Sequence, residues 1–223
     1  MSPSLAIVVP AGPGDEAWRG LLPQLDAAGA QEIALVLTQS DARDVEDLSS
    51  NITLVPSLPG RARQLNAGAA ATCADWLWFL HADSHIGAAT IAGLHRFVRT
   101  NDDAIGYFDL RFLDDGPSLM WLNTLGARLR SRWLGLPFGD QGFLMSRRIF
   151  DAIGGFDEHL VGGEDHALVW MARSLDVQLR PTRAPLHTSA RKYARYGWWS
   201  ITREHLRLTL MQARTFSRQV SPR

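Results

Sequence analysis

Short runs of apolar residues alternate with helical patterns through the first hundred positions of the chain. The runs are rich in β-branched or aromatic side chains, which predicts strands over Leu5–Val9, Ile33–Leu37, Ile52–Val55 and Trp76–Leu80. Apolar positions at helical spacing predict helices over Trp18–Ala28, Arg61–Ala71 and Ala88–Arg99. Because strands that are apolar throughout must be covered on both faces, the pattern predicts a parallel sheet flanked by helices.

The second half of the chain has a mixed pattern. Strands are predicted over Tyr107–Phe112 and Phe143–Ser146, and helices over Leu119–Trp133, Glu164–Arg173 and Tyr196–Phe216. There is no internal repeat and no Pro- or Ser-rich linker. The fold class is therefore expected to be α/β, in a single domain covering residues 1–223.

The carboxyl ends of the strands are where such sheets bind ligands, and the fourth run delivers a polar cluster there. Asp83 can hold a hard divalent cation that also takes diphosphate oxygens, or it can cap the helix that begins near Ala88. His81 points to the same side in an extended chain. It is either a second ligand or a structural histidine.

Two further clusters have charged residues at helix starts. Gly60 precedes a helix whose first turn carries Arg61 and Arg63, which either bind a phosphate group or are simply solvated. Glu164 and Asp165 follow a glycine pair, and they either complement the helix dipole or supply a carboxylate that removes a proton from a hydroxyl.

Charge is unevenly distributed along a chain that is neutral overall. From Val177 onward ten basic residues stand against the single acid Glu204, and Arg191–Trp199 interleaves basic and aromatic residues. The segment from Arg191 to Phe216 either completes the core, or it sits at a membrane surface or meets a lipid-linked or anionic acceptor. A nucleic-acid partner is not expected, since charge alone supports it.

Cysteine content and apolar run length bear on the location of the protein. The lone cysteine, Cys73, excludes an intramolecular disulfide and is expected to be a small buried residue in a helix. The first apolar run stops at Pro10, too soon for a signal peptide, and no run is long enough to span a bilayer. The expected location is the cytoplasm, with peripheral contact at the inner face of the membrane as the alternative.

Taken in order, the motifs of the chain resemble family 2 glycosyltransferases of GT-A fold. More narrowly, they resemble a short bacterial subgroup described as radical-SAM/selenodomain-associated transferases. The matching segments span nearly the whole chain; they are 6–10 (AIVVP), 60–68 (GRARQLNAG), 79–83 (FLHAD), 108–112 (FDLRF), 134–142 (LGLPFGDQG), 154–156 (GGF), 164–165 (ED) and 188–191 (TSAR).

The resemblance implies inverting transfer of a sugar from a nucleoside diphosphate sugar to a hydroxyl acceptor, with Mn²⁺ or Mg²⁺ as cofactor. It implies a GT-A, Rossmann-like and mostly parallel sheet, with residues 1–100 as the nucleotide-binding half, 101–190 as the acceptor and catalytic half, and 191–223 as a basic, aromatic C-terminal helix. Asp165 becomes the general base, Glu164 orients the site, and Asp83 with His81 holds the metal. The implied donor-binding residues are Pro10, Gly60, Arg61, Asn66, Asp83, Asp140, Gln141 and Arg191.

Two loops depart from the family pattern. After the second strand the family has an Asp-Gly-Gly-Ser-x-Asp-like loop, whose first aspartate recognises the nucleotide base. Residues 36–41 of this chain read VLTQSD and lack that first aspartate. Residues 11–16 read AGPGDE, without the usual Asn-Glu. The alternative function is therefore a non-catalytic scaffold that has lost nucleotide recognition. A nucleotidyltransferase is disfavoured, because residues 11–16 contain no Lys or Arg.

Overall fold

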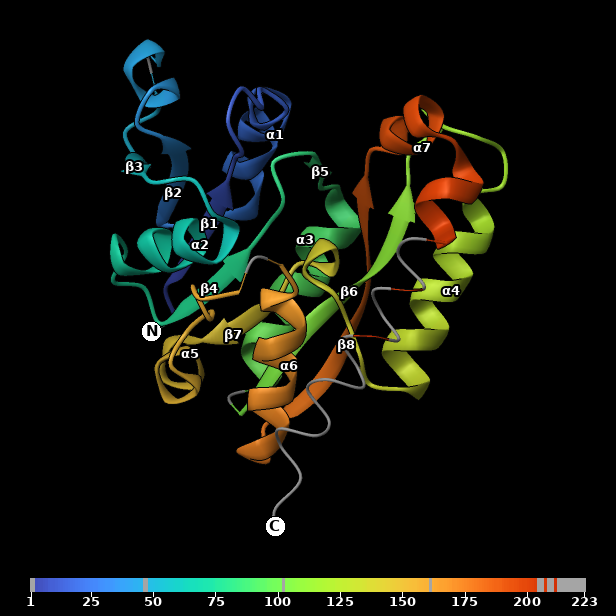
Figure 1. The fold of residues 1–223 in the computed structure, drawn as a ribbon. Helices are drawn as coiled ribbons and strands as arrows, with labels where there is room; N and C mark the ends of the chain where they lie inside the picture. Colours follow the sequence, from blue (N-terminus) through green and yellow to red (C-terminus); the bar gives the residue numbers. More distant parts are fainter. Residues whose placement is uncertain are drawn as a thin grey trace.

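The computed structural model describes residues 3–45, 48–101, 103–160, 162–203, 207 and 211. Within them, strands join into one mixed sheet in the order β3-β2-β1-β4-β7-β6-β8-β5 (Figure 1). The strands are β1 (Leu5–Pro10), β2 (Glu32–Thr38), β3 (Ile52–Ser57), β4 (Trp76–Phe79), β5 (Ser84–His85), β6 (Ala104–Phe112), β7 (Leu144–Ser146) and β8 (Gln178–Thr188). The predicted α/β class, with a mixed and mostly parallel sheet, is confirmed.

The first four predicted strands form the parallel half of the sheet. β3, β2, β1 and β4 all run in one direction, and β1 and β4 are buried along their whole length. β7 runs antiparallel to both β4 and β6, and β6 pairs in parallel with β8. The carboxyl ends of β1 and β4 therefore open at one edge, next to the segment that leads into β7.

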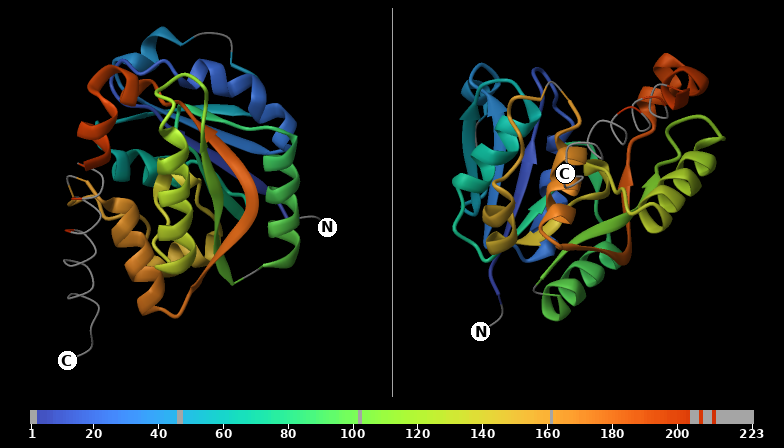
Figure 2. Two further views of the ribbon diagram at one scale, coloured as in Figure 1. Left: turned by 90° about the vertical axis from the view of Figure 1, so that its right-hand side faces the viewer. Right: turned by 60° about the horizontal axis from the view of Figure 1, so that its bottom comes forward.

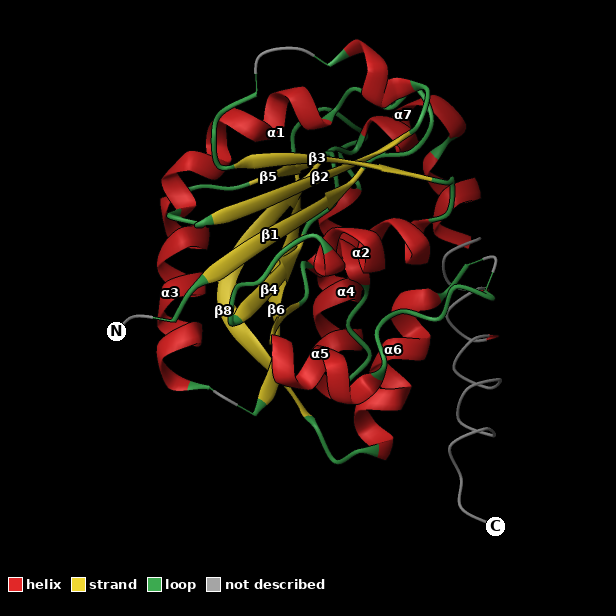
Figure 3. Cartoon of the chain, turned by 90° about the vertical axis from the view of Figure 1, so that its left-hand side faces the viewer, coloured by secondary structure: helices red, strands yellow, loops and turns green. Residues whose placement is uncertain are grey.

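Helices cover both faces of this sheet (Figures 2 and 3). α1 and α3 pack on one face in one apolar cluster, and α2, α5 and α6 pack on the other in a second cluster. Their bounds, with those of the two remaining helices, are α1 (Trp18–Leu25), α2 (Arg61–Ala70), α3 (Ala88–Thr100), α4 (Met120–Trp133), α5 (Arg147–Ile153), α6 (Glu164–Ser174) and α7 (Arg191–Tyr196).

Gly68 lets α2 lie directly on the sheet. A Cβ atom at this position would come within 2.4 Å of Val8 and 2.8 Å of Val36, which are distances that packed side chains do not tolerate. The close approach holds the start of α2, at Arg61, beside the carboxyl ends of β1 and β2.

The structure adds a long strand that the apolar pattern did not reveal. β8 contains Pro181 and Pro185, which lack the backbone N–H of a ladder donor and argue against a central strand. They are tolerated because β5 pairs with β8 only at residues 187–188, which leaves most of β8 at an edge. The short elements β5 and α5 were also not predicted.

Two expectations, one about the closing helix and one about Cys73, are corrected. The closing helix was predicted from Tyr196, but α7 begins at Arg191 and is interrupted at Gly197, whose φ of 85° does not suit a right-handed helix; residues 198–203 are helical again. The rest of the predicted helix, apart from residues 207 and 211, lies outside the described residues. Cys73 is exposed after the end of α2, not buried within it.

No helix in the described part of the chain is both long enough and apolar enough to cross a membrane.

Candidate functional site

Residues from four separate segments, three of them charged, meet at the edge of the sheet where β4 ends. Arg61 comes from the start of α2, His81 follows β4, Gly139 begins the 3-10 turn η3 (Gly139–Gln141), and Glu164 and Asp165 begin α6. Together they line a hollow of about 10 Å³, which is room for one water molecule. Every one of these residues belongs to a motif singled out from the sequence, and the fold brings them into contact.

Arg61 is the cation at the centre of this hollow. Its Nε lies 3.1 Å from Oε1 of Glu164, and its guanidinium also contacts Nε2 of His81. Burial, together with the nearby Arg61 charge, lowers the pKa of His81 well below its usual value, so the ring is neutral and Nε2 accepts. Burial and the neighbouring Asp165 raise the pKa of Glu164 against the opposing effect of Arg61.

The Asp165 carboxylate is held in place by backbone donors. Its Oδ2 accepts the N–H of Gly139 at 2.8 Å, and its Oδ1 accepts the N–H of His166 at 2.8 Å. A methyl group on Gly139 would lie 3.4 to 3.5 Å from His81, Arg61 and Asp165, which is ordinary van der Waals contact. The loop therefore packs directly against the start of α2, the end of β4 and the start of α6.

Asp83 lies beyond the end of β4, half-buried beside β8. The hydroxyl of Thr188 donates to its Oδ2 at 3.2 Å. Burial raises the pKa of Asp83, and Asp15 adds to this effect. A carboxylate that is partly desolvated and short of positive partners favours the approach of a cation.

The carboxyl groups fit a divalent cation that is shared with a ligand, although they do not form an all-protein cage. Within the residues that the structure describes, no three His, Cys, Asp or Glu side chains gather as a metal site. Mg²⁺ and Mn²⁺ nevertheless bind through one or two carboxylates plus phosphate oxygens and water. Asp140, whose charge is felt at the same cluster, has a buried Oδ1 without a hydrogen-bond partner. That orphaned acceptor indicates a site short of positive charge.

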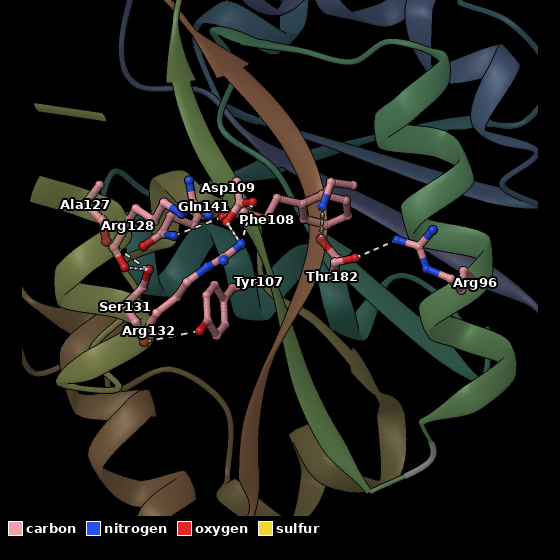
Figure 4. A network of polar contacts seen from close by, with 11 residues as sticks. Arg96, Tyr107, Phe108, Asp109, Ala127, Arg128, Ser131, Arg132, Gln141 and Thr182 are labelled. Carbon is pink, nitrogen blue, oxygen red and sulfur yellow. Dashed lines mark hydrogen bonds and ion pairs between the residues drawn. The ribbon is translucent and has the colours of Figure 1, made fainter. Parts of the chain in front are cut away.

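Gln141 and Asp140 play different parts in η3. Gln141 is fully buried. Its Nε2 donates to the carbonyl of Phe108 at 2.9 Å, which ties the turn to β6 (Figure 4), and its Oε1 accepts the N–H of Phe138 at 3.2 Å. Burial raises the pKa of Asp140 to about 6, while Arg130 lowers it and Asp165 raises it further. Gln141 therefore fixes the conformation of the loop, whereas Asp140 has a buried carboxylate oxygen without a hydrogen-bond partner.

Asp140→Asn is expected to stabilise the protein above pH 6. A carboxyl whose pKa is about 6 in the folded state and 3.8 otherwise destabilises the fold as pH rises through this window, because the unfolded chain releases its proton first. Asparagine removes that cost, worth about 3 kcal/mol at pH 7.5 and only about 0.5 kcal/mol at pH 4. Urea unfolding at both pH values measures the difference; equal stability of the two proteins at pH 7.5 would contradict the assignment.

Asn66 holds a loop rather than facing the hollow. Its Nδ2 donates to the carbonyl of Phe156 at 2.8 Å and to Oε1 of Glu158 at 2.9 Å, while its Oδ1 accepts the N–H of Phe156 at 2.9 Å. Gly155 approaches so closely that a Cβ there would lie 2.8 Å from Oδ1. The amide therefore fastens α2 to the loop before α6.

Asn66→Ala is expected to lower the free energy of unfolding by about 1 to 3 kcal/mol, because it leaves the Phe156 backbone groups without their partner. Asn66→Asp keeps the acceptor for the N–H of Phe156, but it places a carboxylate oxygen against the Phe156 carbonyl and Glu158, so it should not recover the loss. Thermal melting of both variants tests this; an unchanged melting temperature for Asn66→Ala would show that the loop is held by other contacts.

The remaining predicted residues lie around the site at different distances from it. Pro10 ends β1 and is buried, and Gly60, with a φ of 133° that suits glycine, precedes α2. Arg191 stands apart at the start of α7, where its Nε contacts the Ser189 hydroxyl at 2.9 Å and lies 3.9 Å from Asp115. The predicted donor-binding set is thus not one contact group.

Sequence reasoning overlooked Arg130. This residue of α4 lies with its guanidinium carbon 3.1 Å from the centre of the Phe138 ring, and its Nη2 donates to Oε1 of Gln141 at 3.4 Å. It is also the main charge that counteracts the raised pKa of Asp140. Its position inside a basic amphipathic helix gave no local signal of that role.

Of the comparisons with known proteins, only the search of solved structures finds matches, and these concern the fold. No protein-family model matches the chain, and no curated protein matches it in sequence. Residues 1–349 of S. aureus TarS, solved with UDP-GlcNAc, match with a TM-score of 0.59 at 13% identity over 83% of this chain and 58% of that one. The mannosyltransferase PcManGT from Pyrobaculum calidifontis, solved with GDP-Man and Mn²⁺, matches with a TM-score of 0.57 at 15% identity over 85% of this chain and 57% of that one.

The chain thus spans less than two thirds of the length of these two structures. At such low identity the likeness concerns the arrangement of strands and helices. That arrangement is the α/β fold of GT-A glycosyltransferases.

Proposed function

We propose that the protein transfers a sugar from a nucleoside diphosphate sugar to a hydroxyl acceptor, with inversion and with the help of a divalent metal. The observation that carries the proposal is the meeting of Arg61, Glu164 and Asp165 at the carboxyl ends of parallel strands, with Asp83 close enough for its pKa to be affected by the charge of Arg61. The motif order further supports membership of glycosyltransferase family 2, and of the radical-SAM/selenodomain-associated subgroup. Both named structural neighbours were solved with nucleotide sugars.

The donor diphosphate is proposed to lie over the mouth of the hollow. The start of α2 supplies backbone N–H groups after Gly60 and the positive charge of Arg61, both of which favour phosphate oxygens. Asp83 is the principal proposed metal ligand; His81, the second one, already has Nε2 against Arg61. A bound Mn²⁺ or Mg²⁺ supplies positive charge that offsets the charge gathering on the departing diphosphate.

Asp165 is the proposed general base. Its carboxylate takes the proton from the acceptor hydroxyl as that oxygen attacks the anomeric carbon, and the bond between this carbon and the diphosphate oxygen breaks. Attack from the side opposite the leaving group inverts the configuration. The hydrogen bonds from Gly139 and His166 hold the carboxylate in one orientation, and Glu164, paired with Arg61, links the base to the donor side.

We propose that residues 1–223 act as one domain for this reaction. Residues 1–100 contribute Arg61 and Asp83 and form the nucleotide-binding half. Residues 101–190 contribute η3 and α6 and form the acceptor half, and residues 191–223 form the basic C-terminal segment.

A non-catalytic scaffold is the second candidate, and one loop favours it. The carboxylate that follows β2, Asp41, is engaged by two neighbouring groups: its Oδ2 accepts the Thr38 hydroxyl at 2.5 Å and, from the loop after β1, the N–H of Gly14 at 3.2 Å. An aspartate used in this way is not free to read a nucleotide base.

Calorimetric titration with nucleoside diphosphates separates the two candidates. The transferase predicts that at least one of them binds in the presence of Mn²⁺ and much more weakly when the metal is chelated. The scaffold predicts no binding under either condition.

A further inference from the structure

The outer face of α4 is apolar and exposed along its whole length. Trp133 is 83% exposed and Trp121 is 61% exposed, far more than tryptophan usually is on a soluble surface. The face comprises Trp121, Leu122, Leu125, Leu129 and Trp133, flanked by Leu119 and Leu134. The two tryptophans are twelve residues apart, or ~18 Å along the helix at 1.5 Å per residue.

The opposite face of α4 makes the contacts that attach the helix to the sheet. Met120, Ala127 and Ser131 are buried on that inner face. The hydroxyl of Tyr107 donates to the carbonyl of Ser131 at 3.1 Å, and Arg132 donates to both oxygens of Asp109 at 2.7 and 2.9 Å (Figure 4). The helix is thus fixed to β6 from inside, and its apolar outer side chains are not needed for that attachment.

The helical residues 191–203 extend the outer face of α4. Asn123 joins the two parts: its Oδ1 accepts the indole N–H of Trp198 at 2.6 Å and its Nδ2 donates to the Thr202 hydroxyl at 3.1 Å. Trp199 is 70% exposed beside them. Both segments lie on the same side of the molecule (Figure 2).

The charge of these two segments differs sharply from that of the rest of the chain. Residues 120–133 and 191–203 contain seven of the 23 Lys and Arg residues and none of the 23 Asp and Glu residues. The remaining residues therefore carry sixteen basic against 23 acidic side chains. An anionic surface would attract this side of the molecule and repel the others, which orients the protein.

We propose that the outer face of α4, together with residues 191–203, docks on an anionic lipid surface. Tryptophans at both ends of a leucine stripe, with Arg128 on α4 and Lys192 and Arg195 exposed on α7, combine apolar insertion with attraction to acidic headgroups. α4 would lie in the plane of the surface, in keeping with the length of the exposed stripe. The sequence alone placed this contact in residues 191–216; the structure places most of the apolar area on α4.

Docking would bring the proposed site close to the lipid. The segment that follows α4 leads within a few residues to Asp140, and Arg130 of α4 contacts Gln141. The docking itself does not depend on the sugar chemistry, so the two can be tested separately.

Co-sedimentation with vesicles tests the inference on the full chain. The protein should sediment with phosphatidylcholine vesicles that contain phosphatidylglycerol, and not with phosphatidylcholine alone. Binding should weaken as ionic strength rises from about 0.05 to 0.5 M, since the Debye length falls several-fold. The double variant Trp121→Ser/Trp133→Ser should lose roughly tenfold or more of the affinity.

A matched control removes two exposed apolar side chains elsewhere. Met171→Ser/Leu175→Ser, on α6 and directly after it, should bind vesicles as the unaltered protein does. Melting temperature and nucleotide binding in solution, measured on every variant, show that the fold and the donor site are intact.

Three results would overturn the inference. The first is absence of binding to anionic vesicles at low ionic strength in a protein that light scattering shows to be a dimer, with the tryptophan variant monomeric; the face would then contact a second copy. The second is a monomer that binds no vesicles and whose melting temperature falls in the tryptophan variant, which would mean that the chain itself covers the face. The third is equal vesicle binding by the two double variants.

Discussion

Asparagine at position 165 is expected to lower the turnover number about 100- to 10,000-fold, the usual cost of losing a general base. Two backbone N–H donors hold the Asp165 carboxylate in a fixed orientation. Asparagine keeps the shape but cannot accept a proton. Because the donor is proposed to bind through Arg61 and Asp83, donor affinity should change little, and the loss should appear in kcat.

Asp157→Asn is the matched control for this variant. Asp157 also accepts a backbone N–H, that of His159 at 2.9 Å, but it is exposed and outside the hollow. Its replacement should leave turnover unchanged. Near-normal turnover in Asp165→Asn would refute the assignment. If Glu164→Gln then lost most of its turnover while Asp165→Asn kept it, the role of general base would pass to Glu164.

Asp83→Asn is expected to weaken metal-dependent donor binding by about 100-fold or more, which exceeds the effect of losing a supporting residue around a metal. The fold should remain intact, because burial already disfavours the charged form of Asp83 and an amide oxygen can still accept the Thr188 hydroxyl. Calorimetry with a nucleotide and Mn²⁺ measures the affinity.

Asp15→Asn removes a nearby charge without touching the proposed ligand and serves as the control. The charge of Asp15 contributes to the raised pKa of Asp83, yet its own Oδ1 accepts the N–H of Ala17. A similar loss of affinity in both variants would indicate a general electrostatic effect instead of metal ligation. Unchanged Mn²⁺-dependent affinity in Asp83→Asn would contradict the metal site.

The strands that could be predicted from the sequence are those whose apolar pattern is local. β1, β2 and β4 are buried on both faces, so nearly every position in them is apolar, and their predicted bounds differ from the observed ones by one or two residues. β8 could not be found in this way. It is exposed at alternate positions and contains two prolines, and only its pairing with β6 makes it a strand.

The residues of the candidate site likewise divide into those that can be identified from the local sequence and those whose role depends on packing. Each motif could be identified locally, because a glycine or a carboxylate at the end of a strand or the start of a helix has a limited set of uses. The partnership between Arg61 and Glu164 joins residues a hundred positions apart and depends on how α2 and α6 pack on the sheet. The roles of Asn66 in fastening a loop and of Arg130 beside Asp140 depend on the same packing.

A thermal-shift panel of nucleoside diphosphate sugars, each tested with Mn²⁺ and with a chelator, tests the central claim most directly. A ligand that binds only the folded state raises the melting temperature in proportion to its occupancy. We expect at least one donor to stabilise the protein with Mn²⁺ but not with chelator, and Asp83→Asn to lose this shift. The claim would be contradicted if no donor in a panel covering the common bases and sugars shifted the melting temperature under either condition.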